Sequence, residues 1–309
     1  SSKASYGKET TILEFNPGSI MRLSEYKYRN YKFLGCSEGG VHTAMALPQY
    51  KLMFDVGVGH TRLTDFQRLL LTHGHLDHSS GLAYYVSQRA LRRLEPPDIY
   101  CPPELADPLK RIFDIWAEIE GFEAGYKLHP VNYDDYYKLQ GNVYFKAIRS
   151  IHRVPSNGYT ILEKTRKLKE EFQDLPGHEI ASLKQKRDDL FYDHENPIIT
   201  FSGDTQIEFV LQNELVRRSK ILFLECTYVD EKRPVERARE WGHIHLFEIA
   251  EHAEAFKDVE HLFLIHFSPR YRQEVVIQQI KEVLPEWLAQ KTTPFLYSRD
   301  IRNIQPAKR

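Results

Sequence analysis

The chain has 309 residues, of which 41% are hydrophobic and 28% charged, a composition typical of globular proteins that excludes disordered and collagen-like chains. No run approaches the roughly 18 consecutive apolar residues that a membrane span requires, so no spanning helix is expected. Lysine and arginine number 42 against 43 aspartates and glutamates, so no overall field attracts polyanions and a nucleic-acid partner would have to bind local patches.

Short β-branched or leucine-rich runs alternate with longer helical patterns along the chain, which predicts an α/β layered fold. In chain order we predict strands at 31–34, 51–56 and 69–72, a helix at 81–94, a strand at 98–101, a helix at 104–119, strands at 143–148, 159–162, 198–202 and 221–225, a helix at 244–256, a strand at 261–266 and a helix at 273–290. We expect one domain over 1–309.

One stretch, 163–197, departs from this alternation. It is rich in lysine, glutamate, aspartate and glutamine, has few large apolar residues, and contains Pro176-Gly177 near its middle. We interpret it as an inserted arm that binds substrate; the alternative is a pair of charged helices packed on the body. It carries four cations within six residues: Lys164, Arg166, Lys167 and Lys169. They could contact a polyanion, although the neighbouring glutamates favour a solvated helix face.

The three cysteines, Cys36, Cys101 and Cys226, are widely spaced and form no Cys-x-x-Cys pair. This spacing argues against a disulfide framework and against a thiolate zinc site. The first residues contain no apolar stretch of the kind found in a secretory signal. We therefore expect a cytoplasmic protein.

A cluster of metal-ligand side chains follows the apolar run 69–71, in the sequence His73-Gly74-His75-Leu76-Asp77-His78. Imidazole nitrogens and carboxylate oxygens suit Zn²⁺ and similar transition metals. His73 and His75 can point to the same side of an extended segment, whereas Asp77 and His78 lie past a turn and can serve a second metal. A lone histidine is more often structural, but four ligand-type residues at this spacing predict a metal site.

Three further candidate ligands each stand at or just past the end of a hydrophobic strand: His152, Asp204 and His266. Each has a structural explanation when taken alone, such as Asp204 capping the next helix. Their shared position makes them a set that can supply the remaining ligands of two ions.

In these residues the sequence resembles the metallo-β-lactamase superfamily and, within it, the ribonuclease Z family of endonucleases that mature the 3′ end of tRNA. The resemblance covers about residues 33–288 and consists of ordered motifs: His73-x-His75-x-Asp77-His78, His152 followed by Gly158-Tyr159, Phe201-Ser202-Gly203-Asp204-Thr205, Glu225-Cys226-Thr227, Gly242-His243, and His266-Phe267-Ser268-x-Arg270-Tyr271. The stretch Gly242-His243-Ile244-His245 resembles the short form found in plants. The resemblance implies an αβ/βα sandwich, two mixed sheets flanked by helices.

The resemblance also implies two zinc ions, although manganese or iron could take their place. One ion would be held by His73, His75 and His152, the other by Asp77, His78 and His266, with Asp204 bridging them. Two metals about 3.5–4 Å apart lower the pKa of a bridging water to near 7 and so supply hydroxide. Asp77 could orient this water or accept its proton.

The departing ribose 3′-oxygen needs a proton donor, and His243 is the candidate general acid. The resemblance pairs His243 with Glu225, which would raise the pKa of the imidazole. Two alternatives stay open from the sequence. His245 could take the role of the acid, and Glu225 could be a solvent-exposed charge at a strand end.

These features predict a zinc-dependent endoribonuclease that removes the 3′ trailer of precursor tRNA by phosphodiester hydrolysis with a metal-bridged hydroxide. The resemblance also implies a homodimer. Two segments depart from the family: 36–43 replaces a loop with prolines and an arginine-asparagine pair, and Pro176-Gly177-His178 replaces the Gly-Pro element of the arm. One alternative is a related hydrolase of a small phosphodiester or thioester. The other is a non-catalytic binding module, against which the complete ligand set argues.

Overall fold

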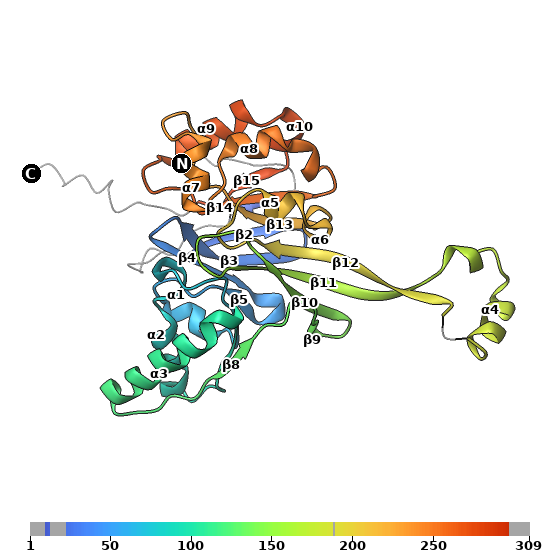
Figure 1. The fold of residues 1–309 in the computed structure, drawn as a ribbon, viewed down its shortest axis with the longest axis horizontal. Helices are drawn as coiled ribbons and strands as arrows, with labels where there is room; N and C mark the ends of the chain where they lie inside the picture. The colour runs from blue at the N-terminus through green and yellow to red at the C-terminus, as the bar shows by residue number, and fades with distance from the viewer. Residues whose placement is uncertain (1–9, 13–22, 188, 297–309) are drawn as a thin grey trace, which may run out of the picture.

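Two mixed β-sheets face each other in the computed structural model, which describes residues 10–12, 23–187 and 189–296 (Figure 1). The first sheet has the order β1 (Thr10–Ile12), β2 (Ser24–Tyr28), β3 (Tyr31–Glu38), β4 (His42–Leu47), β5 (Leu52–Phe54), β6 (Arg68–Leu70), β7 (Asp98–Cys101) and β8 (Lys127–Pro130). The second has the order β15 (Thr292–Pro294), β14 (His261–Ile265), β13 (Ile221–Glu225), β12 (Phe191–Phe201), β11 (Asn157–Leu168), β10 (Val143–Arg149) and β9 (Tyr137–Gln140).

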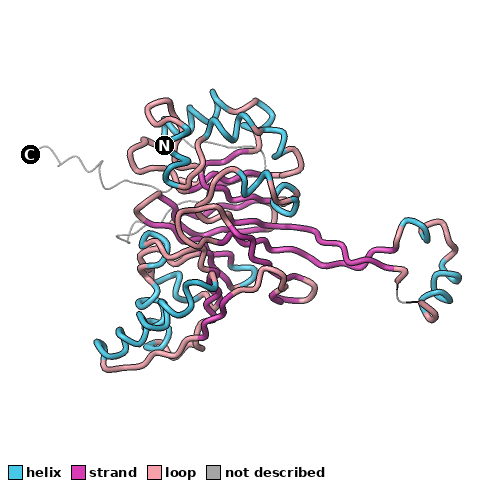
Figure 2. Tube along the Cα trace, in the orientation of Figure 1, coloured by secondary structure: helices cyan, strands magenta, loops and turns pink. Residues whose placement is uncertain are grey.

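Helices lie on the outer sides of both sheets (Figure 2). The first sheet carries α1 (Leu76–Ser79), α2 (Leu82–Leu91) and α3 (Ala106–Glu120), and the second carries α5 (Glu208–Leu211), α6 (Glu214–Arg217), α7 (Val235–Trp241), α8 (Leu246–Glu251), α9 (Gln273–Val283) and α10 (Glu286–Ala289). Short 3₁₀ turns occupy η1 (Pro48–Tyr50), η2 (Thr61–Asp65), η3 (Pro103–Leu105), η4 (Glu170–Phe172) and η5 (Ala253–Phe256). Within the described part of the chain, no helix combines the length and the apolar character needed to cross a membrane.

Aromatic side chains fill the space between the sheets. Phe54 of β5 stacks on Phe201 of β12 with ring centroids 4.7 Å apart, and Phe33 of β3 meets Phe223 of β13 at 4.8 Å. Because successive strand residues point to opposite faces, Leu222 packs instead among the outer helices. The resulting αβ/βα arrangement confirms the fold class predicted from the sequence.

Strand direction brings the chemistry-bearing residues to one edge of the sandwich. Strands β5 to β8 run parallel to each other, and so do β12 to β15. Strand β10 is antiparallel to β11, which is antiparallel to β12, so β10 and β12 run in the same direction. The carboxyl ends of β10, β12, β13 and β14 therefore lie at one edge of the second sheet, where ligands bind in open α/β sheets.

Several predicted elements differ in extent from those in the structure. The predicted helix 273–290 is two helices, because Pro285 follows Leu284, whose ψ of 144° is extended, and the residue before a proline disfavours the helical region. The predicted helix 244–256 begins only at Leu246 and changes to a 3₁₀ turn after His252. Segment 36–43, interpreted as an altered loop, is the end of β3, a turn at Gly40 and the start of β4.

Strands β11 and β12 continue beyond the sheet as a two-stranded ribbon that ends in α4 (Gly177–Lys184) (Figures 1 and 2). Their pairing runs from Tyr159–Phe201 out to Leu168–Phe191, and an irregularity at Pro197 marks the point where burial ends. We call this ribbon and its tip, residues 163–196, the arm. The charged segment is therefore not a pair of helices packed on the body: its cations at 164, 166 and 167 lie on a strand.

Candidate metal centre

The segment from β6 to α1 presents four of the predicted ligands. The strand ends at Leu70, and the chain continues through the buried residues Leu71 and Thr72 to His73. His75 then precedes α1, and the hydroxyl of Ser79 donates to the carbonyl oxygens of Gly74 and His75. After this turn the ring of His78 lies 4.2 Å from that of His73, and Asp77 and His78 belong to a second group of potential ligands.

The other three predicted ligands follow strands of the second sheet. His152 comes after β10, Asp204 after β12 and His266 after β14. Gly203 precedes Asp204 with a φ of 61°, and a side chain at Gly203 would lie 2.7 Å from Thr72 Cβ, so only glycine fits this close approach. His266 itself has a φ of 64°, a left-handed conformation that is costly for a non-glycine residue and that occurs at functional sites.

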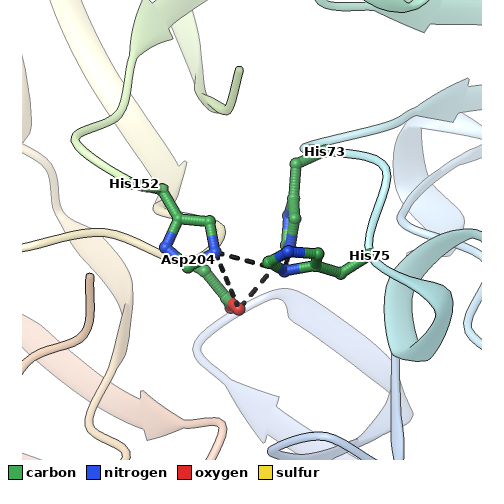
Figure 3. Close-up of side chains that lie close together, drawn as sticks. All are labelled: His73, His75, His152 and Asp204. Atoms are coloured by element: carbon green, nitrogen blue, oxygen red, sulfur yellow. Dashed lines mark hydrogen bonds and ion pairs between the residues drawn. The ribbon is translucent and has the colours of Figure 1, made fainter. Parts of the chain in front are cut away.

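His73, His75, His152 and Asp204 converge at one point, as Figure 3 shows. His75 Nδ1 lies 3.1 Å from His73 Nε2 and 3.2 Å from His152 Nε2. Asp204 Oδ2 lies 3.5 Å from His73 Nε2 and 3.9 Å from His152 Nε2. Four potential ligand atoms thus surround one position, which is the coordination number of zinc in proteins.

Asp77, His78 and His266 form a second convergence on the other side of Asp204. His78 Nε2 lies 3.2 Å from His266 Nε2, and both nitrogens lie 3.3–3.5 Å from Asp77 Oδ2. Asp204 Oδ1 faces them at 3.3 Å from His78 Nε2 and 3.4 Å from His266 Nε2. The two oxygens of Asp204 therefore face different clusters, which is the arrangement a bridging carboxylate requires.

The donor set fits metal cations. Burial lowers the pKa values of His73, His75 and His152, so these imidazoles are neutral and offer lone pairs. Burial raises the pKa of Asp204, but the surrounding histidines outweigh it and hold that pKa well below its usual range. Asp204 Oδ1 is buried without a hydrogen-bond partner, a costly state that a bound cation would relieve.

The second ring nitrogens of His78, His152 and His266 contact fixed protein groups. His78 Nδ1 lies 2.7 Å from Asp55 Oδ2, and the backbone and hydroxyl of Thr72 donate to the same carboxylate. His152 Nδ1 lies 2.8 Å from the Gly242 carbonyl oxygen, and Thr227 Oγ1 lies 3.1 Å from Nδ1 of the His266 ring. Such partners fix the tautomer and orientation of metal-binding histidines.

Sequence reasoning missed Asp55, because the predicted strand 51–56 ran through it. The strand in fact ends at Phe54, and Asp55 has a φ of 53°. Asp55 therefore occupies the same strand-end position that identified Asp204, and that signal could have found it. The segment 36–43 also supports the clusters: Gly40 N donates to Asp77 Oδ2 at 2.8 Å, and His266 N donates to Ser37 Oγ at 2.9 Å.

His243 and Glu225 lie together beside the clusters. His243 Nδ1 is 2.7 Å from Glu225 Oε1 and 4.0 Å from Asp204 Oδ2. Burial lowers the pKa of His243, but the carboxylate of Glu225 outweighs it and raises that pKa to about 9. Glu225 is fully buried and also accepts hydrogen bonds from Thr205 N and Thr227 Oγ1. The interpretation of Glu225 as a solvent-exposed charge is therefore wrong, because its buried carboxylate contacts His243 and accepts hydrogen bonds from neighbouring groups.

The ring nitrogens of His245 contact backbone groups. His245 is fully buried at the start of α8, where its Nδ1 accepts from Phe247 N and its Nε2 lies 3.2 Å from the Asp230 carbonyl oxygen. Both ring nitrogens thus serve the local fold. The alternative in which His245 replaces His243 as the acid is not supported.

Comparison with known proteins agrees with this geometry. A family model for the β-lactamase superfamily domain matches residues 56–267. tRNase Z TRZ1 of Arabidopsis thaliana is 31% identical over 257 residues, covering 82% of this chain and 91% of that protein. Nuclear ribonuclease Z of Triticum aestivum is 36% identical over 154 residues, covering 50% of this chain and 88% of that protein.

Among solved structures, the short form of human tRNase Z superposes with a TM-score of 0.51 at 22% identity, covering 77% of this chain and 92% of that one. At this identity the superposition supports the fold alone. The fold and the histidine-aspartate clusters define a β-lactamase superfamily domain. Within it, the chain belongs to the tRNase Z family, and it is a hydrolytic nuclease. The resemblance seen in the sequence is confirmed.

Proposed function

We propose that this nuclease acts on precursor tRNA and removes the 3′ trailer as a two-zinc endoribonuclease. The observation that carries the proposal is the His243–Glu225 pair, 2.7 Å apart, next to a carboxylate that faces two histidine clusters. This arrangement combines a metal-binding site with a proton donor, which hydrolysis of an RNA phosphodiester needs because the ribose oxygen leaves poorly without a proton.

His73, His75 and His152 would hold one zinc ion, and Asp77, His78 and His266 the other, with Asp204 shared. A pair of such ions supplies a hydroxide nucleophile near neutral pH and polarises the phosphoryl oxygen. His75, Asp77 and His243 are only partly buried, so a substrate can approach the clusters from that side.

The acid step follows from the bonds of His243. Its Nδ1 is occupied by Glu225, so Nε2 is the nitrogen that can hand a proton to the departing 3′-oxygen. Glu225 keeps the ring oriented and charged, since three further donors fix its carboxylate: Thr205 N, Thr227 Oγ1 and Ile244 N. Asp77, whose Oδ2 accepts from Gly40 N, stands where it can orient the attacking water.

Product analysis tests the proposed function. Zinc-loaded protein should release an intact 3′ trailer from a precursor tRNA in a single cut, while an Asp204→Ala variant, which loses the shared ligand, should release none. Gradual shortening of the trailer from its end would contradict endonucleolytic cleavage. Absence of any cleavage by the zinc-loaded protein would refute the assignment.

We further propose that the chain is a homodimer that associates through α3. Four large apolar side chains form an exposed stripe at helical spacing: Ile112, Ile115, Trp116 and Ile119, exposed by 46%, 55%, 45% and 65%. The buried residues Leu109 and Phe113 occupy a different side of the helix. An exposed apolar stripe of this size is characteristic of an interaction surface.

Charge along α3 favours a second copy as the partner. Lys110 and Arg111 lie near its start, and Glu118 and Glu120 near its end. Two antiparallel copies related by a two-fold axis would place Arg111 of one copy near Glu118 of the other. Light scattering should therefore give a dimer for the native chain and a monomer for Ile115→Glu. A monomeric native chain would contradict the proposal. The cytoplasmic location stays a prediction.

A further inference from the structure

A cavity of about 530 Å³ is lined by four cationic side chains: Lys232, Arg233, Arg270 and Arg272. We call it the basic cavity. Its walls come from two segments, 230–233 and 268–275. None of these residues takes part in the proposed catalysis.

The basic cavity is built from the continuation of two site strands. Segment 230–233 follows β13 and Glu225, and segment 268–275 follows β14 and His266. Ser268 N donates to the Thr227 carbonyl oxygen at 3.0 Å, while the hydroxyl of the same Thr227 contacts the ring of His266. One wall of the basic cavity is therefore linked to the second ligand cluster through Ser268 and Thr227.

The cations in this wall are not neutralised. None of the four makes an ion pair within the described residues. Among the described residues that line the basic cavity, the one acidic side chain is Asp230, whose Oδ1 already accepts from Tyr271 OH at 3.1 Å and from Lys232 N at 3.2 Å. Four cations face one carboxylate, which leaves a formal excess of three positive charges in a chain whose net charge is -1.

The position of Arg272 at a helix N-terminus makes its positive charge more unfavourable in the absence of an anion. Arg272 occupies the position before α9, an eleven-residue helix, and makes no side-chain cap. A cation at a helix N-terminus is unfavourable, because the backbone dipole is positive there. An anion in the basic cavity would reverse the sign of that interaction and also meet the guanidinium groups, which match phosphate oxygens in bidentate geometry.

We propose that the basic cavity binds a backbone phosphate of the RNA substrate next to the scissile bond, an inference that rests on the proposed function. The volume fits a sugar-phosphate unit, since ligand pockets span about 300–1,000 Å³. Polyanion binding by this local patch also explains how a nearly neutral chain holds RNA. A small phosphodiester does not extend from the metal centre into the basic cavity and gains nothing from it.

Charge reversal in the zinc-loaded full chain tests the proposal. Arg270→Glu and Arg272→Glu are compared with Lys281→Glu, which changes an exposed cation at the far end of α9. For each variant, kcat/KM is measured with precursor tRNA and with a small phosphodiester. We expect the ratio of the two values to fall at least about tenfold for either arginine variant, because each loses a charged hydrogen bond. Lys281→Glu should keep the native ratio.

The salt dependence gives a second readout. The slope of log affinity for precursor tRNA against log salt should lose about one unit per lost phosphate contact. Zinc content and melting temperature show whether a variant is folded, and Arg272→Lys, which keeps the charge, should retain most of the affinity. An unchanged ratio and an unchanged slope in folded Arg270→Glu and Arg272→Glu would overturn the proposal.

Titration of the protein with inorganic phosphate separates the two sources of a phosphate ligand. If the arginine variants lose phosphate binding but keep the native ratio for precursor tRNA, the basic cavity holds a free phosphate compound and the proposal is wrong. If the native protein hydrolyses the small ester but neither it nor any variant cleaves precursor tRNA, the proposed function is wrong. The assignment of the basic cavity to an RNA phosphate is then wrong as well. If the native protein cleaves precursor tRNA and only the arginine variants have a lower kcat/KM for it, the proposed function and the phosphate site are both supported.

Discussion

Replacing Glu225 by glutamine tests whether its carboxylate keeps His243 protonated for the proposed proton transfer. The carboxylate accepts from His243 Nδ1 at 2.7 Å and is fully buried. Glutamine has the same shape but no charge, so the substitution removes the interaction that holds the proton on His243. Burial of the ring, which lowers its pKa, is then unopposed by Glu225.

The expected magnitude follows from the two pKa values. With Glu225 the pKa of His243 is about 9, so about 90% of the imidazole is protonated at pH 8. Glutamine removes the main interaction that raises the pKa, while burial still lowers it and Asp204 still raises it. For a ring returned to the unperturbed value of about 6.5, about 3% is protonated at pH 8. The rate of tRNA cleavage should therefore fall about 30-fold at pH 8, and little at pH 5.5, where the ring is protonated in either case.

The assay is kcat against pH for precursor tRNA, with Glu248→Gln as the matched control. Glu248 is also buried, and it accepts from His245 N and pairs with Arg239 away from the metal centre. Glu225→Gln should move the descending alkaline limb of the profile to lower pH, whereas Glu248→Gln should leave the limb in place. A uniform loss at every pH, or an equal shift in both variants, would refute the assignment of His243 as the acid.

Three further outcomes are expected. His243→Ala should lower kcat by about 10²–10⁴ with precursor tRNA and less with a phosphodiester whose phenolic group departs without a proton; equal losses would indicate a structural role. Elemental analysis should find about two metals per native chain, as a two-metal site requires, and fewer in Asp204→Asn; one metal in the saturated native chain would contradict the bridging arrangement. Replacing the arm, residues 163–196, by a short Gly-Ser link should weaken binding of precursor tRNA and flatten its salt dependence; loss of small-ester hydrolysis to the same extent would show that the arm supports the core instead.

The site was predictable because its residues interrupt strong local patterns. His73 follows the apolar run 69–71 after one threonine, and His266 directly follows the apolar run 262–265, and a polar ligand at such a place has no role in the core. The ligands lie close together because the strands before them run in the same direction within each sheet and end at one edge of the sandwich, and the α/β alternation predicts that direction. Family membership and the sandwich fold are confirmed, while the zinc ions, the cytoplasmic location and the homodimer stay predictions.

Other features could not be predicted, for physical reasons. The outer part of the arm buries neither face of β11 or β12, so the alternation of apolar and polar residues that marks a strand is absent beyond Glu163. The contact between the Gly242 carbonyl oxygen and His152 could not be predicted, because every residue has a carbonyl oxygen and the sequence does not mark which one is used. The break in the helix at Pro285 was available from the sequence, since proline has no backbone N–H and restricts the residue before it.

Parallel turnover of two substrates tests the central claim most directly. One zinc-loaded preparation is given a precursor tRNA and a small phosphodiester, and kcat/KM is measured for each while the RNA products are mapped by sequencing. The account predicts a single cut that frees the 3′ trailer, with a kcat/KM for precursor tRNA far above that for the small ester. Hydrolysis of the small ester alone, with the precursor left intact, would contradict it.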